Sequence, residues 1–208
     1  MRSNTCRLNT LPKRMQGQQG ASLMVVLILL IIVSLLGVGG IQLATMGERG
    51  ARNDRDQQIA WQAAEAALMD AEMDLDPNSM GTGSRRATFG PTTDASAFVL
   101  NCGSSNTNRG LCAENATGKP AWLTVDFLNT SSPKTAAWGD FTSRGTTYPS
   151  GGGLKSYQPP RYVIEAVKDP AEVQTKGLIE SRYVFRVTAM GFGPRQDIQA
   201  VMQMIYRD

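Results

Sequence analysis

One long uncharged stretch close to the N-terminus dominates this sequence. No charged side chain occurs between Arg14 and Glu48, and the apolar run from Leu23 to Val38 is interrupted only by Ser34. The hydrocarbon core of a lipid bilayer is about 30 Å thick, and a helix needs about 20 apolar residues to cross it. The stretch therefore predicts a membrane-spanning helix over residues 21–47.

The charges on the two sides of this stretch predict its orientation. The N-terminal flank holds Arg2, Arg7, Lys13 and Arg14 without any acidic residue, whereas segment 48–56 carries both signs. Because basic flanks stay in the cytoplasm, we expect a cytoplasmic N-terminus and an exported head. The formal charge of +3 comes from this tail, so we expect no nucleic-acid partner.

A helical pattern continues beyond the apolar stretch. Spacings of three and four between apolar residues predict an amphipathic helix over residues 48–76, which Pro77 ends. Its stripe consists of Ala60, Ala64, Ala67, Leu68, Ala71 and Leu75. Four acidic residues are expected mostly off the stripe: Glu65, Asp70, Glu72 and Asp74. A continuous helix over residues 21–76 would be roughly 84 Å long.

The remaining chain, residues 77–208, predicts a globular head. Residues 77–160 are rich in Gly, Ser, Thr, Asn and Pro, which favours loops and a few short strands. Residues 161–208 contain three strand-like segments with alternating patterns or short turns between them: Arg161–Val167, Arg182–Met190 and Asp197–Tyr206. An antiparallel sheet covered by the helix stripe makes a two-layer α+β domain.

Two cysteines lie in the loop-rich part of the head. Cys102 and Cys112 are close in sequence and on the exported side, which predicts a disulfide between them. Two free thiols are the alternative. A third cysteine, Cys6, lies in the basic tail.

Catalytic and metal-binding patterns are weak throughout the chain. There is no histidine, and the carboxylates form no recognisable catalytic motif, so we expect neither an enzyme nor a cofactor. Asp74, Asp76 and Asn78 begin like a calcium loop, but Arg85 stands where the bidentate glutamate belongs. We therefore assign no metal site.

The start of the apolar run resembles a type IV prepilin leader. The carrying residues are the basic tail 1–20 and the sequence GASLM from Gly20 to Met24. The resemblance implies that a prepilin peptidase removes residues 1–20 between Gly20 and Ala21 and methylates the new amine of Ala21. Two positions depart from the family: Ala21 replaces the usual phenylalanine, and Val25 replaces a glutamate.

The Val25 departure has a physical reading. A carboxylate in the bilayer core costs several kcal/mol unless it is paired. In that family the glutamate neutralises the terminal amine of a neighbouring subunit. Since a subunit without such a neighbour gains nothing from the carboxylate, Val25 suits a subunit at the end of a filament. The alternatives are drift at this position and a membrane protein that is not a pilin.

Longer segments resemble PilX-type minor pilins of the type IV pilus. They are GASLMVVLILLIIVSLLG, DRDQQIAWQAAEAALMDAE, QPPRYVIE and YVFRVTAMGFG, and NRGLC matches more loosely. The resemblance implies the pilin fold, in which a long N-terminal helix packs on a C-terminal antiparallel sheet. It also implies a subunit held in the inner membrane and then carried to the pilus tip.

The same resemblance implies a function and partners. We expect a tip complex that primes filament assembly and supports twitching motility and adhesion. The partners would be other minor pilins, the major pilin, the prepilin peptidase and a large tip adhesin.

Two other functions stay open at this point. A tip pseudopilin of a type II secretion system also tends to lack the membrane glutamate, but usually carries a larger inserted domain. A signal-anchored periplasmic binding module would not need Gly20 directly before the apolar run.

Overall fold

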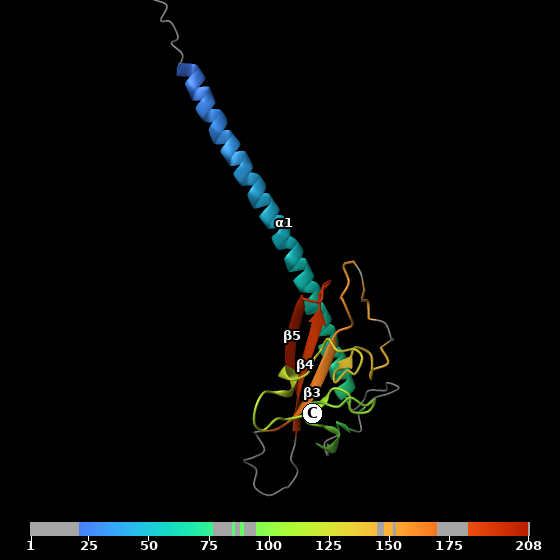
Figure 1. The fold of residues 1–208 in the computed structure, drawn as a ribbon. Coiled ribbons are helices and arrows are strands. Elements are labelled where there is room, and N and C mark those ends of the chain that lie inside the picture. Colours follow the sequence, from blue (N-terminus) through green and yellow to red (C-terminus); the bar gives the residue numbers. More distant parts are fainter. Residues whose placement is uncertain are drawn as a thin grey trace, which may run out of the picture. The chain divides into compact units, whose positions relative to one another are not determined.

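The computed structural model describes residues 21–76, 85, 88–89, 95–144, 148–151, 153–169 and 183–207 (Figure 1). The predicted leader 1–20 and the calcium-like positions Pro77 to Ser79 lie outside these residues. The chain divides into two compact units, Met1–Gly50 and Ala51–Asp208. Each unit is described by itself.

The helix α1 spans Ala21–Leu75 and runs through both units. It contains no proline, and alanine, leucine, methionine and glutamine in its second half all favour helix. Its end at Leu75 lies one residue before the expected Asp76, which agrees with the effect of Pro77 on the preceding backbone. The expected continuous helix is therefore present.

The described part of the head contains one five-stranded sheet. Its strands are β1 (Leu111–Ala113), β2 (Ala136–Ala137), β3 (Arg161–Lys168), β4 (Tyr183–Phe192) and β5 (Gln199–Tyr206). The order is β1-β3-β4-β5, and β2 also pairs with β3. Two short 3₁₀ helices, η2 (Ala95–Ala97) and η3 (Ala121–Leu123), lie in the connecting segments.

Most strand pairs in this sheet are antiparallel. The β3–β4 and β4–β5 pairs have this direction, as expected, with Ile164 opposite Val187 and Thr188 opposite Gln203. The β1–β3 pair is parallel and places Leu111 beside Ile164. The predicted α+β pilin-like fold is confirmed, and the parallel pair makes the sheet mixed.

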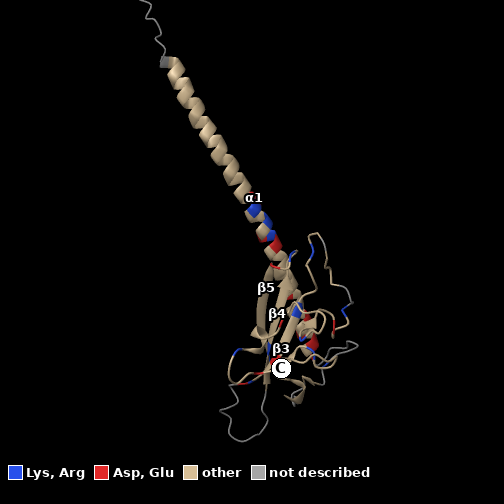
Figure 2. Cartoon of the chain, viewed as in Figure 1, with Lys and Arg blue, Asp and Glu red and all other residues tan. Residues whose placement is uncertain are grey.

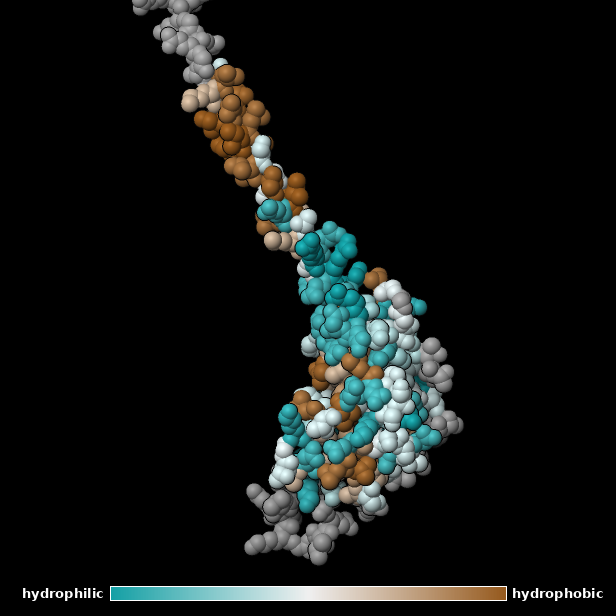
Figure 3. Space-filling model, in the orientation of Figure 1, coloured by the Kyte–Doolittle hydropathy of each residue, from teal (hydrophilic) through white to brown (hydrophobic). Residues whose placement is uncertain are grey.

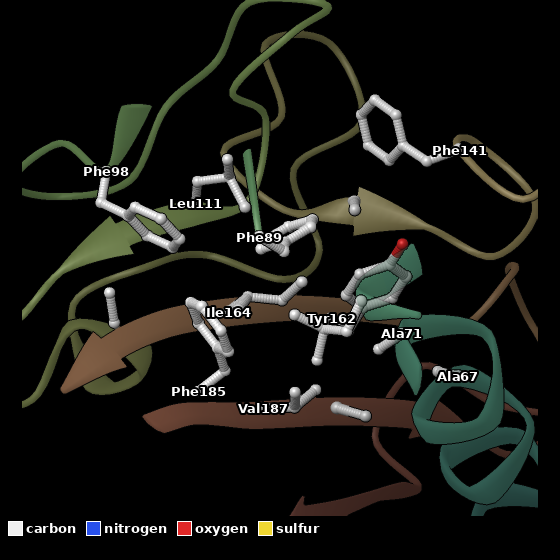
Figure 4. Close-up of a cluster of buried hydrophobic side chains, with 14 residues drawn as sticks. Ala67, Ala71, Phe89, Phe98, Leu111, Phe141, Tyr162, Ile164, Phe185 and Val187 are labelled. Atoms are coloured by element: carbon white, nitrogen blue, oxygen red, sulfur yellow. The ribbon is translucent and has the colours of Figure 1, made fainter. Parts of the chain in front are cut away.

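The main core lies between the second half of α1 and one face of the sheet (Figure 4). Ala67 and Ala71 of the helix contribute to it together with Tyr162 and Ile164 of β3 and Val187 of β4. Three phenylalanines extend the core: the ring centroids of Phe89 and Phe98 lie 5.5 and 5.9 Å from that of Phe185. Alternation in β3 and β4 thus directs one set of side chains toward the helix.

A second apolar layer covers the opposite face of β3 and β4. Loop residues that include Ala121 and Phe127 bury Val163 and Phe192 there, and Met190 packs at the margin. Both cysteines belong to this layer. The middle of the head is therefore the sheet, with α1 on one face and the loop layer on part of the other.

Gly191 is the point where β4 and α1 approach most closely. A Cβ atom at this residue would overlap backbone atoms of Ala60, Ala63 and Ala64. Because the obstacle is backbone rather than a flexible side chain, the helix and the strand would have to separate.

We therefore expect Gly191→Ala to lower the free energy of unfolding by about 1–3 kcal/mol, as overpacked sites do. The measurement is urea unfolding of the full chain in detergent, followed by tryptophan fluorescence. Gly50→Ala is the matched control, because a Cβ there meets nothing within 4 Å. It should stay within about 1 kcal/mol of the wild type. Equal stability of the two variants would contradict the close contact.

Candidate functional site: the membrane and assembly helix

The first half of α1 presents apolar side chains in every direction. From Leu23 to Met46 its large hydrophobic residues are 47 to 74% exposed, and no charged residue of the helix occurs before Glu48 (Figures 2 and 3). Among the described residues, this is the one helix long and apolar enough to cross a membrane. A surface of this kind requires a lipid or protein environment.

Two hydroxyl groups of this half are satisfied within the helix. The hydroxyl of Ser34 donates to the carbonyl oxygen of Leu30 at 2.7 Å, and that of Thr45 donates to the carbonyl oxygen of Gln42 at 2.9 Å. A polar side chain in hydrocarbon needs such a partner, because no water is available there. Both residues are therefore compatible with the membrane.

The predicted processing residues lie at the start of this half. Gly20 is outside the described residues, and Ala21 is the first residue of α1. Val25 follows one turn later and is 55% exposed. The position expected to hold a glutamate is therefore a surface position of an uncharged helical turn.

Small residues line one face of this half. Gly37, Gly40, Ala44 and Gly47 follow each other at spacings of three, four and three. Cβ atoms at the three glycines would meet nothing within 4 Å in this chain. No contact with the described residues accounts for these glycines, and such faces in membrane helices allow close approach of another helix.

The second half of α1 places two carboxylates inside the head. Asp70 and Asp74 are fully buried, so the expectation that they lie mostly off the stripe was wrong. Counting from Ala60, the helix period brings Ala63, Ala67, Asp70 and Asp74 onto one row at spacings of three and four. The expectation was right for Glu65 and Glu72, which are exposed.

Asp74 is held by groups from two other segments of the chain. It forms an ion pair with Arg85 and accepts a hydrogen bond from the hydroxyl of Tyr162 at 3.0 Å. The guanidinium of Arg85 also lies 3.6 Å from the ring centroid of Phe141. Burial and the neighbouring Asp74 carboxylate raise the pKa of Tyr162 well above its ordinary value. Asp74, the first residue of the calcium-like pattern, is therefore already paired with a cation of the chain itself, the guanidinium of Arg85.

Asp70 joins the helix to a different segment. Its carboxylate accepts hydrogen bonds from the hydroxyl of Thr142 and from the backbone N–H of Gly139, the latter at 2.8 Å. Burial raises the pKa of the Asp70 carboxyl above its ordinary value of 3.8, although both hydrogen bonds oppose the shift. The two carboxylates therefore attach segments 139–142 and Arg85 to α1.

The structure contains the disulfide expected between Cys102 and Cys112. The two residues are 5 and 0% exposed and pack in the apolar layer behind β3. Asn101 and Cys102 adopt φ values of 61° and 63°, which turn the chain sharply before the bond. The cross-link stabilises a loop that has little regular secondary structure.

Among the described residues, no group of three or more cysteine or acidic side chains could hold a metal ion. The surface that distinguishes this molecule is the apolar helix rather than a reactive cleft.

Comparison with known protein families agrees with this architecture. The profile of the PilX N-terminal family matches residues 19–68, and that of the type IV pilus assembly protein PilX C-terminal family matches residues 108–208. Together the two matches cover well over half of the chain. No curated protein and no solved structure matches it significantly.

The buried carboxylate of Asp70 should make stability depend on pH. Its pKa is higher in the folded state, so its contribution is complete below about pH 3.8 and is lost as the pH rises through the folded pKa. Asp70→Asn removes this titration. We expect the stability of the wild type, relative to this variant, to fall as the pH rises above about 3.8 in urea unfolding of the full chain.

The exposed Glu72 provides the control for this experiment. Glu72→Gln should follow the wild type across the same pH range. Parallel stability profiles for the wild type and Asp70→Asn would contradict the assignment.

Proposed function

We propose, from the premise that this chain belongs to the PilX family of type IV pilus assembly proteins, that it acts as a minor pilin at the pilus tip. The family is a structural one, and its partners are other pilus components. The finer assignment to the tip goes beyond the family and depends on particular residues of α1.

The proposal begins in the inner membrane. The basic tail and the apolar half of α1 support a single-pass subunit with a cytoplasmic N-terminus and a periplasmic head. The prepilin peptidase then cuts between Gly20 and Ala21 and methylates the amine of Ala21. The apolar helix stays in the mature subunit, first in the membrane and then in the filament.

The observation that carries the tip assignment is Val25. A subunit inside the filament offers its neighbour a carboxylate, which neutralises the neighbour's terminal amine. Burying an unpaired charge costs several kcal/mol, so the pair must form or the charge must be absent. Val25 removes the carboxylate, which suits a subunit that caps the filament and has no amine to neutralise.

This position gives the subunit its function. At the tip, the chain joins other minor pilins in a complex that primes assembly of the major pilin. Such a complex would present a large adhesin and support twitching motility and attachment. The C-terminal match is to a pilus assembly family, so it argues against the alternative of a type II secretion pseudopilin.

Leader processing is tested by mass spectrometry of the mature N-terminus. We expect the purified chain to begin at N-methylated Ala21, because only removal of the charged tail lets the helix enter a filament. Gly20→Val, as a control, should retain the tail and remain in the membrane fraction. A wild-type chain that still begins at Met1 would overturn the proposal.

The tip position is tested by gold labelling of an epitope tag in the head. We expect label at one end of each pilus for the wild type. Val25→Glu should also appear along the shaft, because its carboxylate can pair with a neighbour's amine, whereas the uncharged Val25→Gln should not. Label spread evenly along wild-type pili would refute the tip assignment and leave membership of the family intact.

A further inference from the structure

The strand β5 forms an edge of the sheet that lacks the usual protection against pairing. Its eight residues, QAVMQMIY, include no charge and no proline. Natural edge strands usually carry charges, prolines or bulges that prevent another strand from adding to them. The edge is labelled β5 in Figure 1, and the neighbouring strand on its inner side is β4.

The geometry shows which backbone groups this edge leaves free. The carbonyl oxygen of Ile198 accepts a bond from Gly193 across the turn, so residue 198 points toward β4. Because groups alternate along a strand, Val201, Gln203 and Ile205 direct their N–H and C=O groups away from β4. No described residue makes a backbone hydrogen bond with these three outside the β4–β5 ladder.

The start of the edge is occupied. The side-chain amide of Gln57 on α1 donates to the carbonyl oxygen of Gln199 at 3.4 Å. The free part of the edge therefore runs from Val201 to Ile205.

The side chains of the free residues are also uncovered. The loop layer behind the sheet reaches Met190 of β4 and leaves Val201 and Ile205 46 and 72% exposed. Between them, Gln203 donates to the hydroxyl of Thr188 at 2.9 Å. In Figure 3, hydrophobic patches interrupt the polar surface of the head.

We propose that this edge binds a strand of another protein, which extends the sheet antiparallel to β5. Pairing of this kind satisfies the free backbone groups and covers the apolar side chains in one step. The antiparallel direction continues the β4–β5 pattern and is the more stable one.

Charge on and around β5 defines the chemistry of this partner. A charged residue in the middle of the added strand would lie beside Val201 or Ile205, apolar side chains that offer it no partner. The charges that flank β5 are Arg195 and Asp197 before it and Arg207 after it, all well exposed. The matching strand is neutral, with apolar residues at alternate positions, and has an acidic residue at its N-terminal end beside Arg207.

The direction of β5 disfavours a second copy of this chain as the partner. Gln57 lies at Gln199, whereas Met204 packs on the cluster of Ala67 and Ala71, so β5 runs in the same direction as this part of α1. Two β5 strands paired antiparallel would direct their α1 helices oppositely. Copies whose heads point the same way therefore cannot form this pair.

A peptide probe tests the edge directly. The probe is Asp-Val-Thr-Val-Thr-Val-Lys with N-methylated threonines, which blocks self-assembly and leaves the valine N–H groups free for β5. The control peptide carries the methyl groups on its valines. With the full chain in nanodiscs and the probe at about ten times its Kd, amide exchange at Val201, Gln203 and Ile205 should slow about tenfold.

Variants of the chain separate edge pairing from general adhesion. Gln203→Pro removes a free backbone N–H and keeps every backbone bond to β4, although the side-chain bond to Thr188 is lost. Ile205→Lys places a charge against the added strand. Both should abolish the protection. Leu154→Lys, which adds the same charge to a 63% exposed residue outside the sheet, should preserve it.

Three outcomes would overturn the inference. They are absence of protection by the probe, equal protection by the control peptide, and self-cross-linking in nanodiscs from a photoreactive residue at position 205. The last would identify a second copy as the occupant. None of these readouts involves pili, so a negative result here would leave the proposed function unaffected.

Discussion

The close approach of α1 to β4 is the contact on which the rest of the head depends. Gly191 has no side chain, and the helix faces it with Ala60, Ala63 and Ala64, so the two backbones meet without side chains between them. Such a contact fixes the position of the helix but buries little apolar area. The larger core residues therefore lie elsewhere along the same interface, where Leu75, Tyr162 and Phe185 belong to one buried cluster.

The two buried carboxylates of α1 bind loop segments that the alanine contact does not reach. Asp70 and Asp74 reach from the helix to Gly139, Thr142 and Arg85, segments with little regular structure of their own. Burying such groups carries a desolvation cost, so their net contribution to stability is small compared with the damage from removing one partner. Their effect is to define where the loops attach. The disulfide between Cys102 and Cys112 does the same on the other face of the sheet.

The elements that the sequence predicted are those with local signals. The apolar run, the alanine spacing and the alternation in β4 each depend on a short stretch of chain, and all three correspond to observed elements. The burial of Asp74 has no local signal, because Arg85 and Tyr162 reach it only through the fold. The same holds for β1, which is three residues long and pairs with β3 about fifty residues later. For the candidate site, Val25 could be found only because a family pattern supplied the missing glutamate.

The direction of β5 limits how copies of this chain can pair through its uncharged edge. In a freely diffusing domain, an edge such as Val201 to Ile205 invites antiparallel pairing between copies and hence aggregation. Because β5 runs in the same direction as the Ala51–Leu75 part of α1, an antiparallel pair would place the two heads in opposite directions. Copies whose heads point the same way cannot form that pair. The edge can then stay uncharged and remain open to a strand of another protein that arrives in the opposite direction.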